Sequence, residues 1–168
     1  MADIEYRRFD SAQDDVSQIT EMLHRAYKTL KDMNLHFNAT HQPPERTLYR
    51  LESGSSFVAV SGGHVVGTIT VCPPTQKVPV ETFLDRADVA HFEQFGVEPQ
   101  CQAQGVGRKL LELAEEEARQ MGASYIALDT AEPATHLIEM YESWGYRIVD
   151  VVDWDNVNYL SVIMAKKL

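Results

Sequence analysis

The spacing of apolar residues changes along the chain, and each change predicts a different element of secondary structure. Ile4 to Phe9 alternates between apolar and polar residues, which predicts a short strand. From Asp14 to Leu30 the apolar residues recur at steps of three and four, which predicts an amphipathic helix. Met33 to Gln42 shows no clear period and predicts a loop that ends at two prolines. Pro44 to Leu51 then predicts a second, shorter helix.

The second half of the chain predicts a hairpin followed by helices and strands. Two β-rich runs flank Gly62-Gly63 and predict a β-hairpin from Phe57 to Ile69. Pro73 to Pro79 predicts a turn or loop. Apolar residues at helical spacing from Gly107 to Met121 predict a long helix that ends at Gly122. The remaining segments predict, in chain order, a strand, a helix and two strands: Tyr125–Asp129, Pro133–Trp144, Tyr146–Val152 and Tyr159–Ala165.

One further strand, Val89 to Val97, carries polar side chains among apolar ones. Regular alternation places His91 and Glu93 on one face of this strand. Val89, Phe95 and Val97 are expected to share that face. The predicted order is therefore strand, two helices, three strands, helix, strand, helix and two strands. This order indicates a mixed α/β protein and not a regular βαβ array.

The composition and the charge narrow the functional classes. The chain has 168 residues, which fits one domain spanning residues 1–168. Its 15 Lys and Arg against 25 Asp and Glu give a formal net charge of -10. Nucleic acids and anionic membranes bind to basic surfaces, so this balance argues against both as partners. The acidic excess mildly favours a cationic substrate or partner.

The cysteines and the N-terminus indicate the compartment. Cys72 and Cys101 are far apart in sequence and are expected to be reduced thiols, not a secreted disulfide framework. The N-terminus lacks the apolar core of a signal peptide, and no stretch approaches the ~20 apolar residues that span a bilayer. We therefore expect a cytoplasmic protein without a membrane partner. No spacing typical of a metal site is present, so no metal is expected.

The segment from Phe95 to Arg108 carries the strongest chemical signal. Gly105 and Gly107 lead directly into the long predicted helix. Free amides at a helix start attract anions, and glycines let a bulky anion approach the backbone. The segment lacks the residues of a Walker motif, and Leu110 stands where a dinucleotide motif has its third glycine. From these residues alone, a pyrophosphate site and a simple tight turn both remain open.

Two motifs in this region resemble those of the GCN5-related N-acetyltransferase (GNAT) family. Gln102 to Gly107 matches the family signature Q/R-x-x-G-x-G/A and follows an apolar-V-x-P strand end at Val97 to Pro99. Met140 to Tyr146 is similar to the family's L-Y-x-x-x-G-F/Y helix ending, and the hairpin resembles its second and third strands. The resemblance covers most of the chain. It implies an α/β fold of the α+β type, with a mixed, mostly antiparallel sheet of six to seven strands, about four helices and splayed central strands.

The resemblance implies that acetyl-CoA is the cosubstrate and lies where two neighbouring strands splay apart. The backbone of Phe95, Gly96 and Val97 is expected to pair with the pantetheine arm. The absent side chain of Gly96 is expected to leave room for this ligand. The pyrophosphate is expected to bind backbone amides of consecutive residues: Gln102, Ala103, Gln104, Gly105, Val106, Gly107 and Arg108.

At one position the sequence departs from the family. Ala134 stands where family members often have an asparagine that contacts the pantetheine. The missing hydrogen bond is expected from elsewhere, with Glu132, Thr135 and His136 as candidates.

The resemblance implies acetyl transfer to a primary amine by direct attack in a ternary complex. Tyr141 matches the family tyrosine that protonates the thiolate leaving group, and an ordinary phenol with a pKa of ~10 is protonated at neutral pH. The attacking amine must be neutral, so a base is needed. Glu93 and His91 lie on the strand that enters the cleft, and both are candidates. The alternative is a core aromatic at Tyr141 and surface or paired side chains at the other two positions.

The amine acceptor, a small molecule or a protein, is expected near the first two helices and their connecting loop. The acidic excess favours a cationic acceptor. Candidate wall residues are Tyr27, Met33, Asn34, Phe37 and His41.

Other functions and the oligomeric state stay open at this level. A non-catalytic acyl-CoA-binding or regulatory module with the same fold is the main alternative. A nucleotide-binding phosphotransferase is disfavoured because its lysine and metal-ligand motifs are missing. The resemblance also leaves open a homodimer in which the last strand, Tyr159 to Ala165, pairs across the interface.

Overall fold

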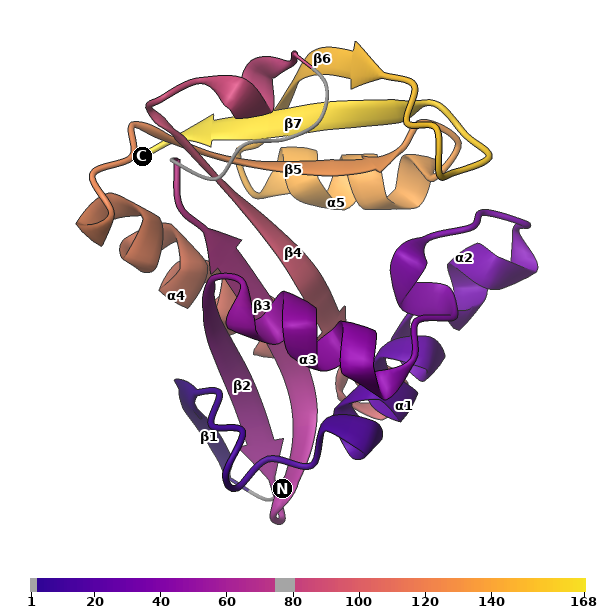
Figure 1. Ribbon diagram of the computed structural model, residues 1–168, viewed down its shortest axis with the longest axis vertical. Coiled ribbons are helices and arrows are strands. Elements are labelled where there is room, and N and C mark those ends of the chain that lie inside the picture. Colours follow the sequence, from indigo (N-terminus) through magenta and orange to yellow (C-terminus); the bar gives the residue numbers. More distant parts are fainter. Residues whose placement is uncertain (1–2, 75–80) are drawn as a thin grey trace.

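The computed structural model describes residues 3–74 and 81–168, which form a seven-stranded sheet with helices on both faces (Figure 1). The strands are β1 (Ile4–Arg8), β2 (Ser55–Ser61), β3 (His64–Cys72), β4 (Val89–Val97), β5 (Tyr125–Ala131), β6 (Arg147–Val152) and β7 (Ser161–Lys167). Their order in the sheet is β1-β2-β3-β4-β5-β7-β6. All neighbours are antiparallel except β4 and β5, which are parallel. The predicted mixed, mostly antiparallel sheet is confirmed.

The helices of the described residues follow the predicted order. They are α1 (Val16–Ala26), α2 (Lys28–Asp32), α3 (Pro44–Glu52), α4 (Val106–Gln120) and α5 (Thr135–Ser143). The first predicted helix is divided into α1 and α2, because the backbone leaves helical geometry at Tyr27. A 3₁₀ turn at Asn38–Thr40 lies inside the predicted loop, and a second at Phe83–Asp85 has no counterpart in the sequence prediction. Most of the predicted turn Pro73–Pro79 lies outside the described residues.

Different helices cover the two faces of the sheet (Figure 1). Helix α4 packs on β2 and β3, and its apolar face shares one core with Tyr141 of α5. Helices α1 and α3 cover the other face with a separate apolar cluster. That cluster is formed by Ile19, Met22, Leu23 and Leu51.

Strands β4 and β5 separate after a short paired stretch. Within the described residues, pairing between them is limited to Val89–His91 of β4 and Tyr125–Ala127 of β5. Beyond this stretch β4 continues beneath α1, while β5 stays paired with β7 (Figure 1). The splayed central strands expected from the sequence are therefore present, and they create an opening in the middle of the sheet.

A β-bulge interrupts β4 beside this opening. Thr70 of β3 pairs with Glu93, whereas Thr68 pairs with Gly96, so β4 contains one extra residue between these pairs. Gln94 lies in the bulge and has a positive φ of 53°.

The bulge corrects the predicted faces of β4. His91 and Glu93 face the side of the sheet that carries α3, where Arg50 contacts Glu93. Phe95 and Val97 instead contact the first turn of α4 on the opposite side. The expectation that all four share one face is wrong, because regular alternation holds only as far as the extra residue.

The sheet ends at β1 and β6, not at the C-terminal strand. β7 lies between β5 and β6, so both of its edges are paired. The last strand therefore has no edge with which to pair across a dimer interface. Strand β6, like β1, has a free edge, and three of its apolar side chains are exposed: Ile148, Val149 and Val151.

Both cysteines are free thiols. Cys72 is buried in β3 and Cys101 is half-buried ahead of α4. None of the helices formed by residues 3–74 and 81–168 is long and apolar enough to span a bilayer.

Candidate active site

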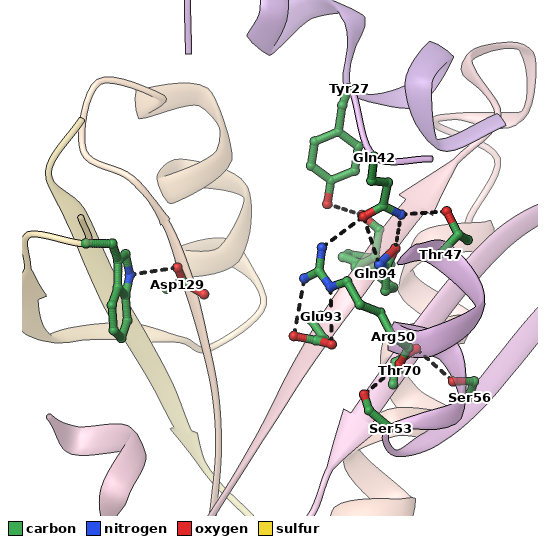
Figure 2. Close-up of polar contacts among 12 residues, drawn as sticks. Tyr27, Gln42, Thr47, Arg50, Ser53, Ser56, Thr70, Glu93, Gln94 and Asp129 are labelled. Carbon is green, nitrogen blue, oxygen red and sulfur yellow. Dashed lines mark hydrogen bonds and ion pairs between the residues drawn. The ribbon is translucent and has the colours of Figure 1, made fainter. Parts of the chain in front are cut away.

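A cavity of about 290 Å³, here called the polar cavity, opens where β4 and β5 separate. Its charged side chains and its histidine come from three elements: His91 and Glu93 from β4, Arg50 from α3 and Asp129 from β5. Figure 2 shows Arg50 and Glu93 on one side of this space and Asp129 on the other.

A hydrogen-bond network fixes Arg50 in the cavity wall (Figure 2). Its guanidinium contacts both carboxylate oxygens of Glu93, at 3.2 Å from Nη2 and 3.4 Å from Nε, and donates from Nη1 to Gln42 at 3.1 Å. Gln42 donates in turn to the buried side chains of Thr47 and Gln94. The bulge residue Gln94 is thus part of the network, and these bonds offset the strain of its positive φ.

The titratable groups of the polar cavity influence one another. Burial lowers the pKa of His91, and the nearby carboxylates of Glu93 and Asp129 act in the opposite direction. Asp129 opens onto the cavity, but surrounding protein displaces water from its carboxylate and raises its pKa. His91 and a 3.1 Å hydrogen bond from Trp154 Nε1 oppose this rise. The lowered pKa leaves His91 neutral at neutral pH, which is the state that a base requires.

Three residues form a set of potential metal ligands. Cys72 and His91 are paired across β3 and β4, and their ligand atoms and that of Glu93 all lie within 4.8 Å of one another. Two features oppose a cation here. Burial raises the pKa of Cys72 to about 12, so the thiol holds the proton that it would have to lose to bind a metal. The positively charged guanidinium of Arg50 already contacts the carboxylate of Glu93. The sequence shows no metal spacing because these ligands meet only through the pairing of β3 with β4.

A second cavity, here called the apolar groove, has a volume of about 530 Å³ and lies between α2, α4 and α5. The first turn of α4 borders it at Gly105, Gly107 and Arg108. Within the described residues, the amides of 103–108 donate no hydrogen bond to protein. These amides and the positive end of the α4 dipole make an anion site. The apolar walls include Leu30, Val97, Leu137, Met140 and Trp144.

Gly105 and Gly96 are needed for different reasons. Gly105 precedes α4 with a φ of 83°, which favours glycine, and a Cβ there would meet nothing within 4 Å. This position is therefore open to a ligand. A Cβ at Gly96 would lie 2.8 Å from Leu23 of α1. The absent side chain of Gly96 makes room for α1 and not, as expected from the sequence, for a ligand.

Tyr141 lies where the polar cavity and the apolar groove meet. It lines the polar cavity and a connecting cavity of about 110 Å³, whose walls include Val97 and Leu137 of the groove. The side chain is almost fully buried and packs against Phe92 and Phe95. Burial raises the pKa of Tyr141 well above its ordinary value, so the phenol is protonated at neutral pH.

Two buried polar atoms along this path lack a hydrogen-bond partner among the residues that the structure describes. They are Oγ1 of Thr130 in the connecting cavity and Nη1 of Arg108 beside the groove. Buried polar atoms normally have partners, so both suit a polar ligand. Of the predicted replacements for the family asparagine, His136 lines the groove, whereas Glu132 and Thr135 do not.

Side chains occupy part of the β4 edge that faces the opening. The carbonyl of Phe95 accepts a hydrogen bond from the Tyr27 hydroxyl at 2.7 Å, and that of Val97 accepts one from Gln102 Nε2 at 3.1 Å. These are backbone groups that the family resemblance assigns to the pantetheine. Each carbonyl has a second lone pair, so a ligand can bind beside these side chains.

Most of the predicted site residues meet in these cavities. The polar cavity contains Tyr27, Phe37, His91, Glu93 and Tyr141. The apolar groove contains Phe95, Gly96, Val97, Gln102, Ala103, Gly105, Gly107 and Arg108.

Several predicted residues lie outside these spaces. Gln104 donates from its side chain to the Gln100 carbonyl at 2.8 Å, and the side chain of Val106 is buried in the core. Asn34 is exposed, and its carbonyl accepts a hydrogen bond from Asn158. The other two candidate wall residues, Met33 and His41, also do not line either cavity.

The sequence analysis missed Arg50 and Asp129. Asp129 is a lone charge at the end of an apolar strand, and this contrast is a signal that could have identified it. Arg50 has no comparable signal, because it resembles any charged residue on an amphipathic helix.

Comparison with known proteins shows the family of the chain. The acetyltransferase (GNAT) family matches residues 18–146. The chain is 30% identical over 156 residues to S-(2-succino)cysteine N-acetyltransferase of Bacillus subtilis (strain 168), covering 92% of this chain and 91% of the relative. A PaiA N-acetyltransferase from Thermoplasma acidophilum, solved in complex with coenzyme A, has a TM-score of 0.74 at 16% identity, with 99% of each chain covered. A GNAT acetyltransferase from Elizabethkingia anophelis with acetyl-CoA bound has a TM-score of 0.66 at 16% identity, with 98% of each covered.

A groove bordered by free backbone amides and a cavity with titratable side chains meet at a protonated tyrosine, and this arrangement suits an acyl transfer. The chain belongs to the acetyltransferase (GNAT) family. It is an N-acetyltransferase that uses acetyl-CoA to acetylate an amine. The family and the fold predicted from the sequence are confirmed.

Proposed function

We propose that the apolar groove binds acetyl-CoA and that the polar cavity binds the amine that receives the acetyl group. The main support for this proposal is the position of Tyr141, because the polar cavity and the apolar groove meet beside its protonated phenol. The free amides at the start of α4 suit the pyrophosphate. The Thr130 hydroxyl and Arg108 Nη1, which lies 3.8 Å from a Glu115 carboxylate oxygen, make no hydrogen bond within the described residues and offer further polar contacts. Structural relatives with coenzyme A or acetyl-CoA bound support the same ligand.

The reaction needs an acid and a base. The amine nitrogen attacks the thioester carbonyl, a C–N bond forms and the C–S bond breaks. The amine loses a proton and the departing sulfur gains one. Tyr141 is the proposed donor to sulfur, because its raised pKa keeps the phenol protonated at neutral pH and it lies where the two cavities meet.

His91 is the proposed base. Its lowered pKa leaves the imidazole neutral and able to accept a proton at neutral pH. Glu93 is the less suitable candidate, because Arg50 contacts both of its carboxylate oxygens, which are therefore already engaged. Asp129 faces the same cavity and stabilises the imidazolium that forms.

The proposed acceptor is a small amino-acid derivative. The Bacillus subtilis relative is named for S-(2-succino)cysteine, a compound with an amino group and several carboxylates. A cavity of about 290 Å³ suits a ligand of this size. The cationic acceptor expected from the net charge stays a prediction, because the cavity presents Arg50 as well as two carboxylates.

A screen of amines for CoA release tests this function. The panel contains S-(2-succino)cysteine, cysteine, spermidine and a lysine-containing peptide, and mass spectrometry identifies any acetylated product. We expect CoA release and an acetylated amine with at least one amino-acid derivative. Acetyl-CoA binding by calorimetry without turnover of any amine would indicate a non-catalytic acyl-CoA-binding module. Binding of ATP in place of CoA would contradict the assignment of the groove.

A homodimer through the edge of β6 is proposed as the assembly. The exposed apolar side chains of Ile148, Val149 and Val151 support it, because a free strand edge with apolar side chains favours pairing. Light scattering after size exclusion should give a dimer for the native chain and a monomer for Val151→Lys. A native monomer at micromolar concentration would contradict the proposal. The cytoplasmic location remains a prediction from the sequence.

A further inference from the structure

We infer that Arg50 binds a carboxylate of the acceptor, so that the polar cavity selects amino acids over amines that lack this group. The inference rests on the proposed function, in which the polar cavity holds the acceptor. It adds the residue that recognises the carboxylate of that acceptor.

The guanidinium of Arg50 has N–H groups to spare. It carries five N–H donors, of which Nε, one on Nη1 and one on Nη2 contact Glu93 and Gln42. The remaining two donors have no acceptor among the residues that the structure describes. Arg50 and Asp129 line the same cavity, and Figure 2 shows them on its two sides. A carboxylate is the ligand that two neighbouring N–H groups of arginine bind best.

The contacts of Arg50 position the guanidinium without saturating it. The distances to Glu93, 3.2 and 3.4 Å, exceed the ~2.7–2.9 Å of a strong charge-assisted hydrogen bond. Gln42 holds the guanidinium from the other side and is itself fixed by two buried partners. A side chain held in this way loses little rotamer freedom when it binds a ligand.

Two other groups of the polar cavity, Asp129 and His91, suit the amino group of the same acceptor molecule. Asp129 attracts an ammonium ion, and His91 accepts the proton that this group must lose before it attacks. His91 and Arg50 both neighbour Glu93, so one small amino acid can reach both. A carboxylate against Asp129 would meet repulsion. The acceptor therefore lies with its carboxylate at Arg50 and its nitrogen between His91 and Asp129.

A purely structural role for Arg50 does not account for its two unused donors. An arginine that only braces α3 against β4 needs no donors directed into a cavity. Arg50 instead lines a cavity with a side chain that is 15% exposed and two donors that are unused by the described residues.

Kinetics with a matched pair of acceptors test the inference. The acid is S-(2-succino)cysteine, and its partner is the same compound with the α-carboxylate converted to the carboxamide. For the native protein we expect kcat/KM to favour the acid by about tenfold to a hundredfold, the range of a hydrogen-bonded charge pair. Arg50→Gln should reduce this acid-to-amide ratio to about one, and Arg50→Lys should retain part of it because the charge remains.

A matched variant controls for charge. Arg46→Gln removes an exposed arginine from the same helix, outside the cavity, and should leave the ratio unchanged. Calorimetric binding of acetyl-CoA by Arg50→Gln at native affinity shows that this variant is folded. The ratio is the decisive readout, because a loss of structure lowers both rates together.

Each result of these experiments either supports the inference about Arg50 or overturns it. The inference is supported if Arg50→Gln loses the preference for the acid over the amide while Arg46→Gln keeps it. An unchanged ratio in Arg50→Gln overturns it, as does faster acetylation of spermidine than of the acid by the native protein; both results leave the proposed acetyl transfer standing. Absence of transfer to any amine, with acetyl-CoA still bound, overturns the proposed function and the inference together.

Discussion

Tyr141 and His91 line the same cavity and are both largely enclosed by protein, yet enclosure prepares them for opposite roles. It disfavours the phenolate of Tyr141 and the imidazolium of His91, so the tyrosine keeps its proton and the histidine is free to accept one. The same physical effect thus prepares an acid and a base, because one group is charged when deprotonated and the other when protonated.

Replacing Tyr141 by phenylalanine removes only the phenolic hydroxyl and therefore tests whether Tyr141 is the general acid. The ring remains to pack against Phe92 and Phe95, so the fold is retained. We expect kcat to fall roughly 10²-fold, the lower end of general acid catalysis, with little change in KM for acetyl-CoA. Tyr49→Phe removes an exposed hydroxyl outside the site and serves as the control. A kcat close to native in Tyr141→Phe would exclude the acid role.

The pH dependence of kcat/KM tests the base. Neutral His91 exists above its pKa, and because that pKa is lowered, activity should hold down to a pH below ~6.5 and then fall. His91→Asn should lower the rate and remove this acidic limb, whereas Glu93→Gln should lower the rate and keep it. Native profiles in both variants would show that neither residue is the base.

At the scale of elements, the site depends on three irregularities. The bulge in β4 turns Phe95 and Val97 toward α4 while His91 and Glu93 stay on the face of α3. The separation of β4 from β5 opens the sheet, and the start of α4 leaves its amides free. Each irregularity removes pairing that a regular sheet or capped helix would have, and each exposes a group that a ligand can use.

Substitution of Gly105 tests the start of α4. Gly105→Ala has space for its Cβ but must adopt a φ of 83°, at a cost of about 1–2 kcal/mol. We expect the loop to shift, the amides to lose alignment and KM for acetyl-CoA to rise ~10-fold. Gly62→Ala imposes a similar strain at a φ of 57° in the hairpin turn and should leave KM unchanged. Equal effects of both substitutions would point to general destabilisation.

At the scale of the whole molecule, the net charge of -10 is compatible with an anionic cosubstrate. Backbone amides at the start of α4, with Arg108 beside the groove, provide the local positive potential. The groove also draws its walls from α2, α4, α5 and β4, which are far apart in the sequence. A ligand in it therefore links segments that are distant in the sequence.

Thermal unfolding tests this link. At a concentration of ~100 times its Kd, acetyl-CoA should add ~2.7 kcal/mol to the free energy of unfolding. For a protein of this length that raises Tm by roughly 5–10 °C. ATP at the same concentration is the control and should give no comparable shift. A larger shift with ATP than with acetyl-CoA would contradict the assignment of the groove.

The sequence by itself determined the order of the elements, the family, and the residues of the loop before α4. These features depend on local patterns: apolar spacing, turn glycines and a motif of six neighbouring residues from Gln102 to Gly107. Tyr141 could be found in the same way, because its motif is also local.

Only the tertiary structure decided which side chains share a cavity. The faces of β4 depend on one extra residue at Gln94, which pairing with β3 reveals and alternation does not. Arg50 and Asp129 reach the cavity from α3 and β5, so no spacing in the sequence joins them to His91. The physical reason is that motifs record contacts between near neighbours in the chain, whereas charge pairs and cavities form between segments that only packing brings together.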